Sequence, residues 1–153
     1  MKNKSVILGI IIIVVVSLLT TGCAIKSALS VQEFKDHMGA LGYSTTEDEK
    51  ALYEAKSYLV ASKSDVPYKI EFYEFEEKVE AQKVFKKYTD NIADYLTTSS
   101  KNIKTTGALF DKFVAKSDNE YIVVDRVKNT LIFIAGTVDY QEEIDSLLED
   151  INY

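Results

Sequence analysis

Residues that commonly carry out chemistry are scarce in this chain. Cys23 is the only cysteine and His37 the only histidine among 153 residues. A nucleophile with a general base needs such residues side by side, and a zinc site needs several of them. His37 falls within a predicted helix beside Asp36, which favours a surface position, and the chain has no nucleophile-elbow motif. The sequence therefore predicts no nucleophilic catalysis, no metal site and no cofactor.

Carboxylates are the remaining catalytic candidates. They gather at residues 47–49 and again from Glu71 to Glu80. A pair such as Glu71 and Glu74, or residues of the 76–80 cluster, could act as the acid and base of glycoside cleavage. Helix capping and a solvated acidic face explain the same residues without catalysis. We expect a protein that is not an enzyme, and we keep a carboxylate-based hydrolase of cell-envelope glycans as an alternative.

Tyrosines offer a different kind of candidate site. Tyr68 and Tyr73 lie on opposite faces of one predicted strand, and Tyr121 lies on another strand. A tyrosine ring combines a flat apolar body with a hydroxyl, which suits sugars or peptides. Aromatic residues also fit ordinary half-buried strands. We favour ordinary strand packing and name these three tyrosines as a possible ligand surface.

The N-terminal segment gives Cys23 another meaning. Two lysines within the first five residues precede the uncharged stretch 5–25, and residues 6–19 are almost wholly aliphatic. The stretch ends in Thr20-Thr21-Gly22-Cys23. A basic start, a short apolar core and small residues at its end are typical of an export signal. Residues 1–23 resemble a bacterial lipoprotein signal peptide with its lipobox.

This resemblance implies that the chain is cut after Gly22 and that the Cys23 sulfur receives a diacylglyceryl group. Fatty acids such as palmitate would then hold the protein in the membrane, because two acyl chains suffice for stable anchoring. The predicted organisation is a signal peptide at 1–22, a lipidated tether at 23–29 and one extracytoplasmic domain at 30–153. An uncharged stretch of about 20 residues can also span a bilayer. A single-pass membrane protein with a structural or sensor domain is therefore the alternative.

The charge of the chain narrows the range of partners. The net charge is −6, and loss of the first 22 residues would leave 16 basic and 24 acidic residues, a net charge of −8. Such a surface disfavours nucleic acids, whose phosphates need clustered lysine and arginine. The only arginine, Arg126, is expected to pair with Asp125 or Glu120 rather than to capture an anion.

Residue periodicity predicts the element order α-β-β-α-β-β-β-α, with a short extra strand near Tyr43. Helices are expected at 30–41, 76–98 and 139–151, and strands at 57–63, 68–75, 108–115, 120–127 and 130–137. Residues 97–106 are expected to form a loop. The uninterrupted apolar run TLIFIA indicates a central strand. The predicted fold is α+β: a two-layer sandwich of a mainly antiparallel sheet with its helices packed on one face.

These observations favour a non-catalytic binding or interaction module, anchored on the extracytoplasmic side of the cell membrane. Its partner would be an envelope protein, a peptide or a glycan. The stretch DRVKNTLIF with its following amphipathic helix is similar to small uncharacterised bacterial lipoproteins and carries over no functional residue.

Overall fold

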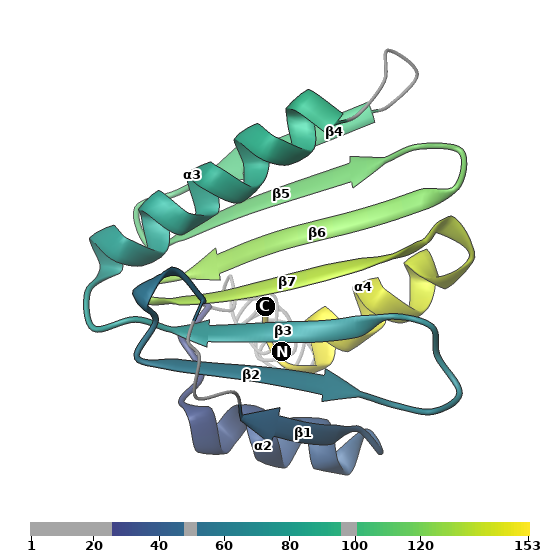
Figure 1. Ribbon diagram of the computed structural model, residues 1–153, viewed down its shortest axis with the longest axis horizontal. Helices are drawn as coiled ribbons and strands as arrows, with labels where there is room; N and C mark the ends of the chain where they lie inside the picture. The colour runs from purple at the N-terminus through teal and green to yellow at the C-terminus, as the bar shows by residue number, and fades with distance from the viewer. Residues whose placement is uncertain (1–25, 48–51, 96–100) are drawn as a thin grey trace, which may run out of the picture.

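A computed structural model describes residues 26–47, 52–95 and 101–153. These residues form an antiparallel sheet of seven strands in the order β1-β2-β3-β7-β6-β5-β4, with helices on both of its faces (Figure 1). The α+β class is therefore as predicted. Among these residues, no helix has the length and the apolar character needed to cross a bilayer.

The elements follow the predicted order, with the short extra strand expected near Tyr43 present as β1 and one strand, β4, that is not expected. The strands are β1 (Ser44–Glu47), β2 (Ser57–Ser62), β3 (Lys69–Glu74), β4 (Lys101–Thr106), β5 (Phe110–Lys116), β6 (Glu120–Val127) and β7 (Thr130–Thr137). The helices are α2 (Val31–Ala40), α3 (Lys78–Tyr95) and α4 (Gln141–Asp150), and short 3₁₀ turns lie at Leu52–Glu54 and Val138–Tyr140.

Two antiparallel meanders, β1-β2-β3 and β4-β5-β6-β7, join through the pairing of β3 with β7. This pairing places Phe72 opposite Ile132. Strand β7 consequently lies in the middle of the sheet, and its segment from Thr130 to Ile134 is buried apart from a half-buried Phe133. The prediction of a central strand from TLIFIA is confirmed.

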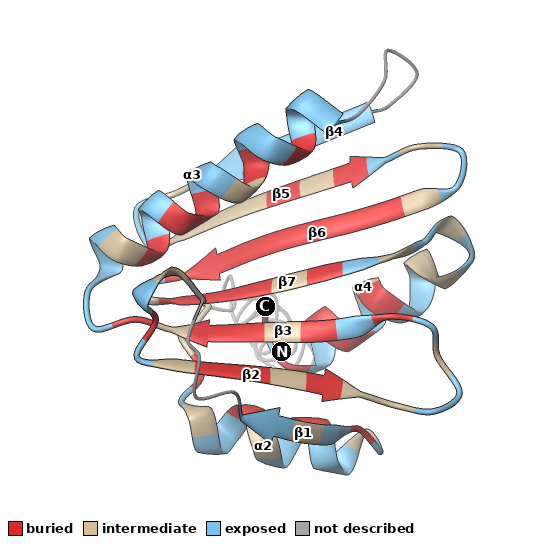
Figure 2. Ribbon diagram, viewed as in Figure 1, coloured by how far each residue is buried: buried red, intermediate tan, exposed pale blue. Residues whose placement is uncertain are grey.

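Helices cover both faces of the sheet, so the prediction that they pack on one face is wrong. Helices α2 and α4 pack on one face, called here the α2/α4 face, where the Phe34 and Phe72 rings stack with centroids 4.5 Å apart. Helix α3 packs on the opposite face, called the α3 face, over Phe113 and Val124. Figure 2 shows buried residues running along the central strands. Both faces of those strands are apolar, so both need a cover.

Strand β4 lies in the segment that the sequence analysis assigns to a loop. All six of its residues are exposed, and they pair with β5 at one edge of the sheet. An exposed edge strand needs no apolar alternation, and lysines on such a strand discourage pairing with other chains. The segment therefore lacks the pattern from which strands are predicted.

The helical spacing of apolar residues in 76–98 predicts that one stripe of α3 is buried, and this prediction is only partly correct. The predicted stripe is Val79, Val84, Tyr88, Ile92, Tyr95 and Leu96, of which Leu96 lies outside the described residues. Val84 and Ile92 are buried as predicted, and Tyr88 is half-buried. Val79 and Tyr95 are instead 52% and 70% exposed. Their places in the core are taken by the buried residues Ala81, Phe85 and Thr89.

Two helices end in the same way. Gly42 after α2 and Asn152 after α4 adopt left-handed backbone angles, with φ of 82° and 60°. The next residue in each case, Tyr43 or Tyr153, donates its amide to a carbonyl five residues back at 2.8 Å. This is the hydrogen bond of a Schellman motif. Both tyrosines are thereby directed into the core of the α2/α4 face.

Candidate functional site

The three tyrosines named from the sequence do not form one surface. Tyr68 and Tyr121 lie on the α2/α4 face, where their hydroxyls donate to Glu143 at 2.8 Å and to Asp145 at 2.6 Å. Tyr73 lies on the α3 face. All three side chains are at most 3% exposed. They are core residues with bonded hydroxyls, and a ligand does not reach them in this structure.

The carboxylates named as hydrolase candidates are also separated. Glu71 and Glu74 are three residues apart on β3, so their side chains leave opposite faces of the sheet. Glu80, in the first turn of α3, accepts a hydrogen bond from the Glu77 amide at 3.1 Å. This contact caps the start of the helix. The pair Glu71 and Glu74 therefore cannot act together on one glycosidic bond.

Glu71 instead lies in a cluster of tyrosines on the α3 face. Its carboxylate accepts hydrogen bonds from the hydroxyls of Tyr73 and Tyr88, the second at 3.4 Å. The two hydroxyls are themselves 2.8 Å apart. Burial, reinforced for Tyr73 by its hydrogen bond to Glu71, raises the pKa of both phenols, so they remain protonated donors. The Phe133 ring stacks on Tyr88 with centroids 4.7 Å apart.

A hollow of about 330 Å³ opens beside this cluster. It is lined by Tyr53, Glu54, Glu80, Lys83, Val84 and Lys87. The Tyr53 ring meets Tyr88 edge-on at 5.4 Å, and the Lys87 ammonium lies 4.8 Å from the Tyr53 centroid. The hollow therefore presents an aromatic ring together with groups of both charges.

The backbone at this hollow adopts an unusual conformation. Tyr53 and Glu54 both have left-handed angles, with φ of 62° and 57°. Neither residue is a glycine, and such a conformation costs on the order of 1 to 3 kcal/mol for each residue. Strain of this kind gathers at binding sites, where it fixes a side chain in a required position. Here it positions the Tyr53 ring against α3.

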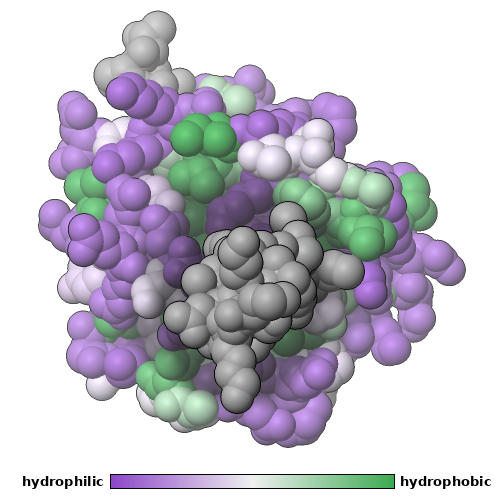
Figure 3. All heavy atoms as spheres, turned by 180° about the vertical axis from the view of Figure 1, so that it is seen from behind, coloured by the Kyte–Doolittle hydropathy of each residue, from purple (hydrophilic) through white to green (hydrophobic). Residues whose placement is uncertain are grey.

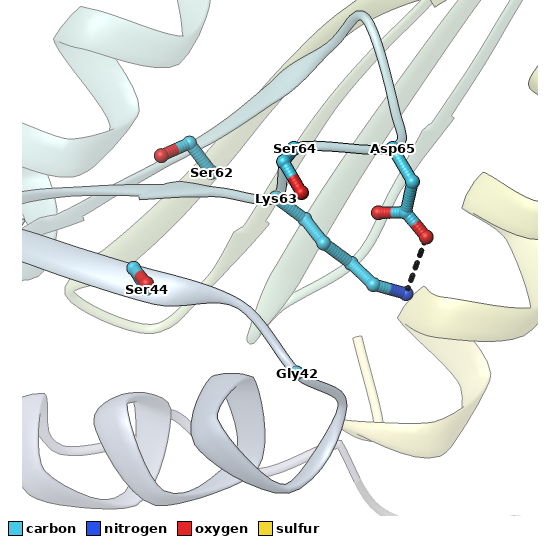
Figure 4. Close-up of a pocket in the computed structure, with 6 residues that line it drawn as sticks. All are labelled: Gly42, Ser44, Ser62, Lys63, Ser64 and Asp65. Carbon is cyan, nitrogen blue, oxygen red and sulfur yellow. Dashed lines mark ion pairs between the residues drawn. The ribbon is translucent and has the colours of Figure 1, made fainter.

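A second hollow, of about 540 Å³, lies at the β1 edge of the sheet. It is lined by Gly42, Ser44, Ser62, Lys63, Ser64 and Asp65 (Figure 4). The Lys63 side chain extends toward Asp65, with 3.4 Å between ammonium and carboxylate. The Lys63 ammonium is therefore engaged by Asp65, and the rest of the lining consists of small polar residues.

The expected partner of the only arginine is wrong. Arg126 is fully buried on the α3 face, and its Nε donates to Asp111 at 2.6 Å. Asp125 is its neighbour on β6, so the side chain of Asp125 leaves the opposite face. The interpretation of Arg126 as a structural residue, rather than an anion-capturing one, is compatible with this pairing.

Asp125 binds the start of the described chain. It is 0% exposed, and its Oδ2 accepts a hydrogen bond from the Lys26 ammonium at 3.1 Å and forms an ion pair with the Lys112 ammonium at 3.4 Å. The Lys26 ammonium also lies 5.7 Å from the Phe110 centroid. Leu29 is only 7% exposed in the core of the same face. The folded domain therefore includes residues 26–29, which the sequence analysis assigns to the tether.

Lys26, Asp125 and Tyr53 are not predicted as site residues from the sequence. The sequence does contain a pattern that indicates Asp125. This residue interrupts the apolar run of β6, and a buried carboxylate requires a partner. Gly22 and Cys23 lie outside the described residues. Within the residues that are described, no group of three or more histidine, cysteine, aspartate or glutamate side chains could hold a metal ion.

Comparisons with known proteins leave the site to be interpreted from its own geometry. The chain matches no protein-family model, no curated protein and no solved structure.

Proposed function

We propose that this chain is an extracytoplasmic lipoprotein, held in the cell membrane by acyl chains on Cys23, whose domain is a non-catalytic binding module. The observation that carries the proposal is the junction of leader and domain. The apolar leader ends at the only cysteine, and three residues later Lys26 is bound to a buried carboxylate. A lipid attached at this point would hold the domain directly at the membrane.

The hollow at Tyr53 is the proposed binding site of this module. A half-exposed tyrosine ring can stack on the apolar face of a sugar or on a peptide side chain. Lys83 and Lys87 supply donors, while Glu54 and Glu80 supply acceptors around that ring. This combination suits a polar cell-envelope ligand, either a glycan or its attached peptide. The hollow at Lys63 offers only small polar groups and a lysine already engaged by Asp65, so we favour the Tyr53 site.

The anchor is tested by the mass of the protein extracted from membranes. We expect a chain that lacks residues 1–22 and carries added acyl mass. A Cys23→Ser variant should leave the membrane fraction, whereas a Thr21→Ser variant should remain there as the matched control. An intact N-terminus in the membrane-bound protein would instead support a spanning helix, and Cys23→Ser protein that fractionates like the wild type would contradict the lipid anchor.

The binding site is tested by exchanging Tyr53 for alanine. Soluble cell-wall fragments that carry glycan and peptide are the probes. Tyr53→Ala should weaken binding about tenfold, which corresponds to about 1.4 kcal/mol and to the loss of one aromatic contact. Tyr95→Ala removes an exposed tyrosine from the end of α3 and should bind as the wild type does. Equal binding by all three proteins, or no binding to any fragment, would contradict the proposal.

A further inference from the structure

The contact between Lys26 and Asp125 fixes the point at which the chain leaves the folded domain. That point lies on the α2/α4 face, because Asp125 leaves β6 on that side together with Lys112. Cys23 is three residues away, and three residues of extended chain span at most about 11 Å. A lipid on Cys23, or a spanning helix that ends at Ile25, would therefore hold this face close to the bilayer.

The part of this face formed by β4 and β5 carries apolar and basic side chains. The strand register places Ile103 opposite Val114, and Lys101 opposite Lys116, on the same side as Lys112. Ile103 is 66% exposed, and Val114 is half-buried. In Figure 3, which views the molecule from this side, an apolar patch borders a hollow of hydrophilic atoms.

Acidic side chains lie elsewhere. Asp111, the one carboxylate within β4 and β5, is paired with Arg126 on the α3 face. The exposed acids of the α2/α4 face lie mainly on helix α4, which packs on β7. These are Glu142, Glu143, Glu149 and Asp150. The face is thus divided into a basic and apolar part over β4 and β5 and an acidic part over α4.

We propose that the α2/α4-face surface of β4 and β5, centred on Ile103 and Val114 and bordered by Lys101 and Lys116, rests on the bilayer that holds the anchor. This inference depends on the membrane anchor proposed above. Anionic lipid headgroups attract nearby lysines and repel the acids of α4. The domain therefore tilts with β4 and β5 against the lipid. The α3 face, with the hollow at Tyr53, then points away from the membrane toward its ligand.

Two adjacent residues of one strand provide a matched test. Ile103 and Asn102 are both exposed, and their side chains leave opposite faces of β4. If Cys23 is acylated, an Ile103→Cys or Asn102→Cys variant carries a single free thiol for an environment-sensitive fluorophore. The acylated proteins are purified from membranes and placed in vesicles of phosphatidylglycerol and phosphatidylcholine that contain a lipid-bound quencher. We expect at least threefold stronger quenching at position 103 than at position 102.

Charge provides a second, independent variant. Lys101 lies on the proposed membrane-contact side of β4, and Lys104 lies on the α3 face over the Phe85 ring. Lys101→Glu should reduce quenching of the label at position 103 at least twofold. Lys104→Glu makes the same charge change on the opposite side and should leave the quenching unchanged.

The outcomes separate this inference from the proposed function. Equal quenching at positions 102 and 103, or stronger quenching at 102, in a protein of confirmed acylated mass overturns the orientation and leaves the lipid anchor standing. A label at 103 that is shielded without vesicles, in a protein that sediments as a dimer, assigns the surface to a second copy and also overturns it. Absence of the protein from membranes overturns both proposals.

Discussion

Replacing both lysines that contact Asp125 should destabilise the domain far more than either single replacement does. The perturbation is Lys26→Gln and Lys112→Gln, alone and together. Both ammonium groups lie within 3.4 Å of one oxygen of a carboxylate that is 0% exposed, and the other oxygen has no hydrogen-bond partner among the described residues. The site therefore contains two positive charges and one negative charge, and one cation is enough to balance the buried anion.

The expected losses in the free energy of unfolding follow from this balance of charges. The side chains of Lys26 and Lys112 are 25% and 29% exposed, so either single replacement should lower the free energy of unfolding by about 1 kcal/mol or less. The double replacement leaves the buried Asp125 charge without a partner, which costs about 3 to 5 kcal/mol. The loss in the double variant should thus exceed the sum of the two single losses by at least about 1 to 3 kcal/mol.

Urea denaturation followed by circular dichroism measures these differences. With a slope of about 2 kcal/mol per molar urea, the double variant should lose about 1.5 to 2.5 M in its midpoint. Adding Asp125→Asn to the double variant removes the unpaired charge and should recover most of the loss. Single effects that simply add, or a triple variant no more stable than the double, would refute the argument that Asp125 needs one of these cations.

Three further predictions concern stability. Gly42→Ala forces a side chain into the left-handed region and should lower the free energy of unfolding by about 1 kcal/mol. Gly42→Asn should cost less, because Asn152 occupies the equivalent position after α4. Equal losses of the two variants in thermal denaturation would contradict this prediction. Asp111→Ala strips the buried Arg126 of its carboxylate and should cost about 3 to 5 kcal/mol by urea denaturation, whereas Asp90→Ala, which breaks an exposed pair on α3, should cost about 0.5 kcal/mol or less. Burial raises the folded-state pKa of six tyrosines, so above about pH 10 the unfolded chain releases phenolic protons that the folded chain retains, and stability should fall as the pH rises. A combined absorbance and circular dichroism titration should find that tyrosinate forms as the protein unfolds. Ionisation of these tyrosines in the intact fold would contradict the prediction. The six tyrosines are Tyr43, Tyr68, Tyr73, Tyr88, Tyr121 and Tyr153.

The membrane-anchor and ligand-binding proposals rest on different parts of the chain. The anchor is inferred from the leader and from Cys23, which lie outside the described residues, and the position of Lys26 supports it from within the domain. The binding site is inferred from the hollow at Tyr53, on the opposite face of the sheet from Lys26. A failure of either proposal therefore does not decide the other.

Local patterns in the sequence were sufficient for most of the elements. The S-x-x-E pattern of Ser30 and Glu33 predicts a capping box, and this box is present at the start of α2. The helical spacing of Ile144, Leu147, Leu148 and Ile151 predicts an apolar stripe, and all four residues are buried. Helix caps and residue periodicity act over a few residues, so a sequence reveals them directly. Strand β4 escaped prediction because an exposed edge strand carries no such pattern.

Only the tertiary structure decided which groups meet. Lys26 and Asp125 are 99 residues apart in the chain, and Arg126 and Asp111 are 15 apart. These pairs depend on strand register and on which face each side chain leaves, because a shift of one residue reverses the face. Because side chains alternate between the two faces of a strand, Glu71 and Glu74 lie on opposite faces, and the three candidate tyrosines point into the core. Short-range periodicity determined the elements, whereas the pairing of distant strands determined the sites.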